Sequence, residues 1–310
     1  MSIFVSHSNS TWVDEILSNG LNLGGFTLPE NVVELILSKV PNEDILNCKL
    51  VCHTWKDIVA RNSFLKLRFE EKGLNWNSIP DKFKSDSKYR PILHAHLRHG
   101  ILSKNYVRNS SGQDEFRGWQ KIAGDWIVSQ EPFGCEPLPT STFFKRVGQS
   151  CFVLKSYKGA KCYCIDLRKE GLTPEILELM LPFKLKFSQL YAASSSTPTM
   201  FKWSIVMWNE QKDFRRKYSS PIKILPSGKW QKVEYSFKFG NNARNLKELK
   251  GLRQIFLVNE VYTENTSTPD EIQRDPLNVK FARACVTLEL LNSEPDESSS
   301  QAVSMEGGHD

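Results

Sequence analysis

The stretch from Leu28 to Ala60, LPENVVELILSKVPNEDILNCKLVCHTWKDIVA, decides how this chain is organised. Thr27 and Glu30 flank Pro29 in the T-x-x-E pattern of a capping box, which predicts that a helix begins here. Pro41 ends this helix, because the residue before a proline is disfavoured in the α region. Between these limits the apolar residues recur at helical spacing, at Val32, Val33, Ile36, Leu37 and Val40.

Two shorter helices are predicted after Pro41. Asn42 can cap a turn that runs through Ile45 and Leu46, and Asn47 can cap a third helix. Three such short helices expose more apolar surface than they can bury among themselves, so we expect a partner surface. The alternative is an ordinary helical hairpin inside a larger core. The third helix would carry one apolar face made of Cys48, Cys52, Trp55 and Val59.

The landmarks of this stretch resemble an F-box, the helical module that docks a substrate receptor onto the Skp adaptor of a cullin-type ubiquitin ligase. Some of the residues concerned must hold the F-box together instead of touching the adaptor, and the sequence does not separate the two roles. The landmarks are Leu28-Pro29, Pro41, Ile45-Leu46, Val51-Cys52 and Trp55-Lys56. The resemblance implies an adaptor contact at or near Leu28, Pro29, Ile36, Val40, Ile45, Leu46 and Trp55.

Composition places the chain among soluble globular proteins. It has 310 residues, enough for about two domains, of which 40% are hydrophobic and 25% charged. No apolar run approaches the ~20 residues that span a bilayer, and the N-terminus lacks the pattern of a secretory signal. We therefore expect a cytoplasmic protein that can also be nuclear, without membrane insertion. Its seven cysteines are odd in number and irregularly spaced, which favours free thiols over disulfides.

The second part of the chain, from Asn105, has the sequence pattern of an all-β domain. Short runs alternate apolar and polar residues, as in Phe201–Trp208, Lys232–Phe239 and Phe281–Leu290, with turn residues between them. Only Pro174–Met180 is predicted to be helical. The pattern indicates an antiparallel β-sandwich or jelly roll.

These patterns predict an α+β multidomain chain, in which a small helical F-box precedes a jelly-roll, galactose-binding-like β-sandwich. The predicted divisions are a flexible segment at 1–26, the F-box at 27–73, a helical linker at 74–104, the sandwich at 105–291 and a disordered acidic tail at 292–310.

The landmarks of the second half are similar to the F-box-associated (FBA) domain, the sugar-binding sandwich of F-box proteins that recognise N-linked glycans. In that family, sugar lies on loops at one end, between an early aromatic and a late Tyr-Trp-Lys type run. Tyr157 is the nearest match to the early aromatic, and the late run falls on Asp275, Pro276 and Leu277, which are not aromatic. Weak chitobiose binding is therefore expected. The landmarks include Asn105-Tyr106-Val107-Arg108-Asn109, Gly124-Asp125-Trp126, Ile165-Asp166-Leu167, Tyr191-Ala192-Ala193 and Arg283.

Catalytic and metal-binding patterns have little support. The chain has no G-x-S-x-G, H-E-x-x-H or Gly-rich phosphate loop, so we expect no enzyme activity and no cofactor. Cys162-x-Cys164 has no second pair at zinc-ligand spacing, and His94 does not join His96 and His99 on one helix face. The basic run at 212–217 is interpreted as a solvated strand end or loop rather than as a nucleic-acid site.

We therefore expect the substrate-recognition subunit of an SCF-type (Skp–cullin–F-box) ubiquitin ligase. The F-box would bind the adaptor and, through it, the cullin and RING subunits, while the sandwich binds substrate. Two substrate modes are open: the N-glycans of misfolded glycoproteins exported from the endoplasmic reticulum, or the surface of a non-glycosylated protein. A different class is a carbohydrate-binding module with no ligase role.

Overall fold

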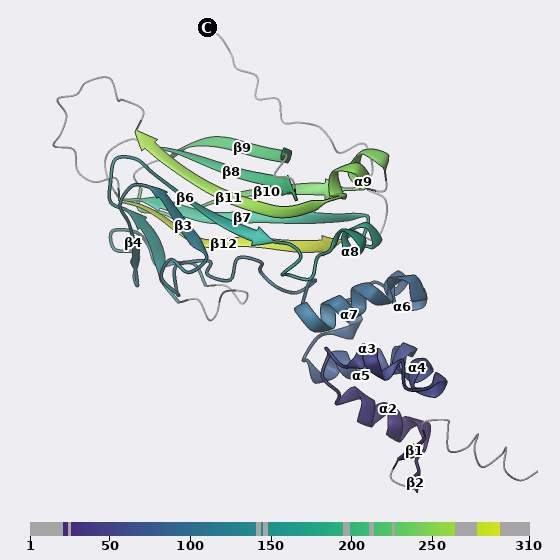
Figure 1. The fold of residues 1–310 in the computed structure, drawn as a ribbon. Helices are drawn as coiled ribbons and strands as arrows, with labels where there is room; N and C mark the ends of the chain where they lie inside the picture. Colours follow the sequence, from purple (N-terminus) through teal and green to yellow (C-terminus); the bar gives the residue numbers. More distant parts are fainter. Residues whose placement is uncertain are drawn as a thin grey trace, which may run out of the picture. The chain divides into compact units, whose positions relative to one another are not determined.

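The computed structural model describes residues 21–23, 26–140, 144, 148–194, 199–210, 214–224, 227–240, 242–263 and 278–291. The chain divides into two compact units, one ending at Gly100 and the other beginning at Ile101 (Figure 1). The narrower limits predicted from the sequence stay predictions. Most of the segment 1–26 and all of the tail from 292 lie outside the described residues.

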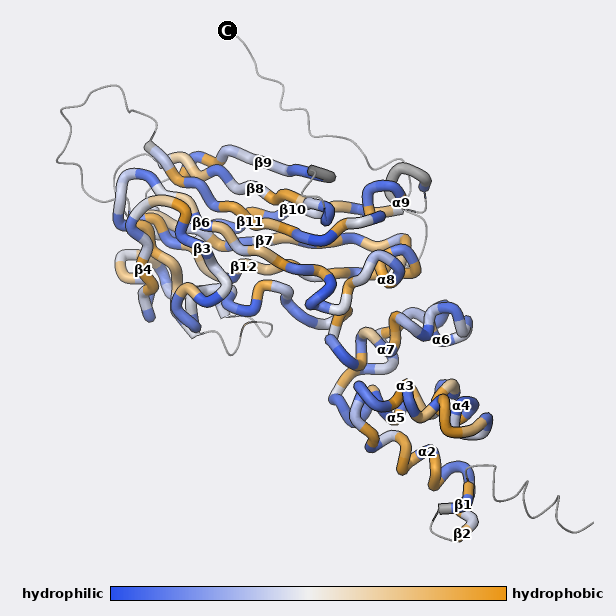
Figure 2. Tube along the Cα trace, viewed as in Figure 1, coloured by the Kyte–Doolittle hydropathy of each residue, from blue (hydrophilic) through white to orange (hydrophobic). Residues whose placement is uncertain are grey.

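The first unit is helical. A two-stranded hairpin, β1 (Asn22–Leu23) and β2 (Phe26–Thr27), leads into the helices. In Figure 2, α2 is coloured largely orange, because most of its residues are apolar. The α-helices are α2 (Glu30–Ser38), α3 (Ile45–Cys48), α4 (His53–Ala60), α5 (Asn62–Glu71), α6 (Asp81–Ser85) and α7 (Arg90–His99), with short 3-10 turns at Trp76–Ser78 and Ser87–Tyr89.

A small core and one buried arginine hold these helices together. The core is made of Val33, Leu37, Ile45, Cys48, Ile58, Val59 and Phe64. Arg68 on α5 is 4% exposed, and its guanidinium donates to the carbonyls of Ser38 and Val40 and to the side chain of Asn42. The last carbonyls of a helix lack partners within it, so Arg68 satisfies the C-terminal end of α2 and ties it to α5.

Two details of the predicted helices are wrong. The position before α2 is Pro29, without a side-chain cap, because Thr27 pairs with Asn22 in the hairpin and Glu30 forms an ion pair with Arg61 instead. The predicted helix from Asn47 is broken at 49–52. It restarts at His53, because Cys52 is extended and its thiol accepts a hydrogen bond from the backbone N–H of Trp55.

The second unit is a sandwich of two five-stranded antiparallel sheets, as predicted (Figure 1). One sheet has the strand order β10-β7-β12-β5-β4 and the other the order β3-β6-β11-β8-β9. The strands are β3 (Trp119–Ala123), β4 (Trp126–Ser129), β5 (Cys151–Leu154), β6 (Gly159–Asp166), β7 (Phe183–Ala193), β8 (Thr199–Asn209), β9 (Phe214–Ile224), β10 (Gln231–Phe239), β11 (Leu252–Thr263) and β12 (Val279–Leu290).

The alternation that predicted the strands is confirmed on β8 and on β12 from Ala284 to Leu288, but it is interrupted at the start of β12. Phe201, Trp203, Ile205 and Met207 are each at most 1% exposed. On β12 the register shifts between Ala282 and Cys285, where Arg283 has a φ of 52°. This bulge changes the face on which the preceding residues lie, so Phe281 packs against Phe201 in the core, although a strict period of two would place it opposite Ala284 and Val286.

The sandwich also contains two helices rather than one. The predicted helix is confirmed as α8 (Pro174–Leu179), capped by Thr173, whose side chain accepts from the backbone N–H of Ile176. A second helix, α9 (Ala243–Leu249), was not predicted. Its only large apolar residues are Leu246 and Leu249, too few for a clear helical period.

We expect a fragment of residues 101–291 to fold without the helical unit, because its strands form a compact unit of their own. The measurements are far-UV circular dichroism and a thermal melt of the purified fragment. The expected result is a β-rich spectrum and one cooperative transition. A mainly helical spectrum, or no transition, would contradict this prediction.

Candidate functional site

The F-box stretch exposes large apolar side chains. Leu50 is 84% exposed and Leu46 51%, at positions where an isolated domain gains nothing from an apolar residue. Several such side chains on one small unit indicate a protein-binding surface. We call them the apolar docking residues: Leu35 and Ile36 of α2, Leu46 of α3, and Leu50 and Val51 of the following turn.

The structure separates the predicted adaptor residues by burial. Pro29, Ile36 and Leu46 are exposed. Ile45 is 3% exposed and belongs to the core, so it supports α3 rather than offering contact surface. The remaining three are partly buried against the core: Leu28, Val40 and Trp55.

Three of the apolar docking residues were missed by sequence reasoning. Leu35 lies beside Ile36 in a helix that is apolar on more than one face. Leu50 and Val51 lie in the break before α4, where a continuous helix had been predicted. One feature of the sequence could have identified Leu50 and Val51: neither residue belongs to the apolar face predicted for that helix.

One end of the sandwich carries the other predicted site residue. Tyr157 is 39% exposed in the turn between β5 and β6. This turn packs against the turn between β3 and β4: the Lys155 N–H donates to the Asp125 carbonyl at 2.8 Å, and the Asp125 N–H donates to Ser156 Oγ at 2.9 Å. Gly124 has a φ of 85°, and a Cβ there would lie 2.5 Å from the Lys158 carbonyl oxygen. The two turns therefore fix the place of Tyr157.

Other exposed apolar side chains lie around the same end, which we call the loop end. Strand β11 ends there, since Val261 pairs with Gly159, and the next residue, Tyr262, is 38% exposed. The segment with Phe133 reaches the end of β7, because Glu136 N–H donates to the Gly228 carbonyl and Gly228 N–H to that of Ala193. The exposed large apolar side chains of the described sandwich are Ile122, Ile127, Phe133, Tyr157 and Tyr262.

The loop end contains a buried lysine, and the late run predicted for this end lies outside the described residues. Lys280 is 2% exposed, and its Nζ donates to Ser194 Oγ at 2.9 Å and to the Asn278 carbonyl at 3.3 Å. Lys155 Nζ donates to the side chain of Asn278 at 3.2 Å. Two lysines thus hold the start of β12. The predicted late run of Asp275, Pro276 and Leu277 lies outside the described residues.

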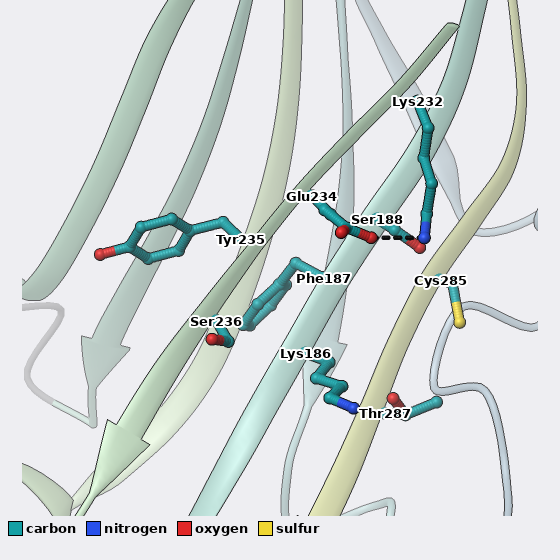
Figure 3. A pocket seen from close by; sticks show the side chains of 9 residues that line it. All are labelled: Lys186, Phe187, Ser188, Lys232, Glu234, Tyr235, Ser236, Cys285 and Thr287. Atoms are coloured by element: carbon teal, nitrogen blue, oxygen red, sulfur yellow. Dashed lines mark ion pairs between the residues drawn. The ribbon is translucent and has the colours of Figure 1, made fainter. Parts of the chain in front are cut away.

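A separate hollow of about 410 Å³ lies on the outer face of strands β10, β7 and β12 (Figure 3). Small polar side chains line it between longer charged ones, and Lys232 forms an ion pair with Glu234. Burial raises the pKa of the Cys285 thiol to about 11, so this group is protonated at neutral pH and is a poor nucleophile. The lining gives no support to catalysis here.

Several of the described cysteines and histidines are buried. All seven cysteines are free thiols, as predicted. His96 is buried against the ring of Phe69, and burial lowers the pKa of His94 to about 4. In the described parts of the chain, no three His, Cys, Asp or Glu side chains gather as metal ligands. None of the described helices is long and apolar enough to cross a bilayer.

Comparison with protein families agrees with both units. Residues 26–67 match the F-box domain. Residues 98–268, more than half of the chain, match the family described as F-box associated region. The chain is an F-box protein with an FBA domain. The F-box match covers β2 to most of α5 and so includes all five apolar docking residues. The FBA match covers the loop end as far as Tyr262.

Curated relatives of this F-box protein are distant. F-box only protein 2 of Bos taurus is 22% identical over 219 residues, which cover 68% of this chain and 70% of that protein. F-box only protein 17 of Rattus norvegicus is 24% identical over 211 residues, covering 64% and 81%. A solved structure of TmCBM61 with beta-1,4-galactotriose has a TM-score of 0.32 at 13% identity, covering 61% of this chain and all of that one. A structural similarity this low carries no functional information.

Proposed function

We propose that this F-box protein is the substrate-recognition subunit of an SCF-type ubiquitin ligase. The observation that carries the proposal is the set of five exposed apolar docking residues, all within the matched F-box. Docking on a Skp adaptor would bury this set, since exposed apolar surface on a small unit indicates a partner. The chain would contribute proximity between substrate and ubiquitin carrier, while other subunits perform the transfer.

Co-purification with a Skp adaptor tests this function. The full chain should retain the adaptor, and the fragment 101–291, which lacks the F-box, should not. A full chain that folds but does not retain the adaptor would overturn the proposal. Retention by the fragment alone would place adaptor binding on the sandwich and would also contradict it.

We further propose that the loop end of the sandwich holds the substrate, and that its first candidate class is misfolded N-glycosylated protein marked for proteasomal degradation. Tyr157 supports this proposal, because it offers an aromatic face to the apolar side of a sugar ring. Tyr262 offers a second exposed ring at the same end. If the receptor acts in the degradation of such proteins, we expect it in the cytoplasm, with the nucleus as a further location.

Chitobiose binding by the wild type is expected to be weak or absent. The late run Asp275, Pro276 and Leu277 supplies no ring and no ammonium donor. Each aromatic contact contributes on the order of 1 kcal/mol, so a site lacking the late aromatics loses about tenfold or more in affinity. Titration calorimetry with chitobiose and with a high-mannose glycoprotein measures it.

Tyr157→Ala is the diagnostic variant for this titration. A low-micromolar dissociation constant that is lost in Tyr157→Ala would show that another group, such as Tyr262, replaces the late run. Ile127→Ala is a matched control, because Ile127 is 40% exposed near the same end but presents no ring.

A further inference from the structure

One layer of side chains inside the sandwich is polar. On the inner face of the sheet β3-β6-β11-β8-β9, the strand registers align residues in rows that cross all or most strands. The row Trp119, Tyr163, Leu257, Ile205 and Tyr218 is aromatic or aliphatic. The next row consists of Lys121, Lys161, Asn259, Trp203 and Ser220. Beyond it, the row Gly159, Val261, Phe201 and Ile222 is apolar again.

The opposite sheet contributes Gln189 at the same level. Two residues of β7 on either side of Gln189 show that it lies at the level of the polar row. Tyr191 contacts Phe201 of one apolar row, at 5.4 Å between ring centroids. Phe187 pairs with Tyr235, whose ring stacks at 3.7 Å on Tyr218 of the other apolar row. Gln189 lies between them. It pairs with Val233 of β10, and on its other side it is opposite the β12 bulge, where it has no register partner.

Four side chains of this layer are buried and carry polar atoms that lack hydrogen-bond partners within the described residues. Lys161 and Asn259 are 0% exposed, Trp203 1% and Gln189 2%. The atoms without a hydrogen-bond partner are Lys161 Nζ, both side-chain polar atoms of Asn259, both of Gln189, and Trp203 Nε1. Buried polar groups in folded proteins are almost always hydrogen-bonded, to protein or to ordered water. Six orphans would cost much of the stability of an ordinary domain.

The chemistry of these six atoms determines which kind of ion or molecule can bind in the layer. The Trp203 indole N–H only donates, so it offers no lone pair to a metal cation, and Lys161 Nζ repels a cation whenever it is protonated. The amide oxygens of Asn259 and Gln189 need donors, which a simple anion does not have. Water donates and accepts, and it is the usual partner of otherwise unsatisfied buried groups.

We propose that ordered water molecules bind between the two sheets, in the layer formed by Lys161, Asn259, Trp203 and Gln189. The layer ends at the partly buried Ser220 on the edge strand β9 and at the exposed Lys121 on the edge strand β3, so water can reach it from the edges of the sheet. This hydration site is independent of adaptor docking and lies apart from the exposed side chains of the loop end.

Water cross-relaxation at the tryptophan indoles of the full chain tests the site, with ¹⁵N-tryptophan labelling. Nuclear and rotating-frame Overhauser effects of opposite sign separate bound water from proton exchange. The Trp203 indole N–H should show a bound-water signal, assigned by its loss in Trp203→Phe. The matched controls are Trp119 and Trp126, whose indoles donate to the carbonyls of Asn109 at 2.7 Å and Ala123 at 2.8 Å, and they should show none.

A crystal structure of the full chain supplies a measurement that needs no variant. Water density within hydrogen-bond distance of Trp203 Nε1 and of Asn259 or Gln189 is the expected result. A direct bond between the two amides with no density in the layer would overturn the proposal, as would the absence of a bound-water signal at Trp203. Anomalous signal at this position after a bromide soak would assign an anion and also overturn it.

Discussion

An F-box in which Ile36 and Leu50 are both alanine should bind the Skp adaptor at least about a hundredfold more weakly than the wild type. Truncating a well-buried interface anchor often costs about 2 kcal/mol or more, and each 1.4 kcal/mol is tenfold in affinity. Ile36 is 44% exposed and Leu50 84%, so their loss should leave the F-box folded. Titration of the purified full-length variants with adaptor, together with a thermal melt, measures both quantities.

Two control variants distinguish docking from folding. Ile45→Ala should destabilise the helical unit by about 2–5 kcal/mol, because Ile45 is 3% exposed in the core and its truncation leaves a cavity. Ile122→Ala, which shortens an exposed apolar side chain of the sandwich, should change neither quantity. Undiminished adaptor binding in the double variant, with an unchanged melt, would remove the apolar docking residues from the interface.

The F-box could be predicted from its landmarks and from the residues that begin and end its helices, but not from helical period alone. Pro41 and the apolar spacing before it placed α2 closely. The prediction of a continuous third helix was wrong. Nothing in the local sequence shows that Cys52 adopts an extended conformation and that α4 begins after it. Leu50 and Val51 are exposed because of that break. Their role as contact candidates therefore follows from backbone geometry, which composition does not encode.

The sandwich was predictable wherever a strand alternates regularly. The period of two placed Phe201, Trp203, Ile205 and Met207 on the buried face of β8, as the structure confirms. A bulge shifts that period by one residue. A strict period of two would therefore place Phe281 on the wrong face, since a positive φ at Arg283 is set by tertiary contacts rather than by local preference. The loop end could be located only as far as Tyr157, because the two turns that fix this residue are distant in sequence.

The polar layer was not foreseen for a different reason. Lysine and asparagine on a strand predict an exposed face, since such residues are rarely fully buried. Lys161 is instead enclosed by aromatic rings, with its Nζ 3.5 Å from the centroid of Trp119 and 4.3 Å from that of Phe152. Those rings come from β3 and β5, which belong to different sheets. The environment of Lys161 therefore exists only once the sandwich has closed.

Lys161→Met should stabilise the sandwich at neutral pH, by more than the ~0.5 kcal/mol within which surface substitutions usually fall. Burial lowers the pKa of Lys161 well below its usual range, so folding at pH 7 requires the side chain to lose its proton or to carry a buried charge. The ring cage favours the ammonium by about 2 kcal/mol or more at a desolvated site, while burying the charge costs several kcal/mol, and we expect the cost of burial to be the larger. Methionine has a similar length and no charge.

The stabilisation should depend on pH in a defined direction. Between the lowered folded pKa and the usual lysine value near 10.5, the unfolded chain binds more protons than the folded one. Wild-type stability should therefore rise with pH through this window, and the advantage of Lys161→Met should shrink between pH 7 and pH 10. Lys158→Met, at an exposed lysine of the adjacent turn, should change stability by less than about 0.5 kcal/mol at either pH. Urea unfolding of the full chain at both pH values, followed by tryptophan fluorescence, measures the difference. A Lys161→Met variant less stable than the wild type at pH 7 would mean that the ring cage binds the ammonium strongly enough to outweigh its burial.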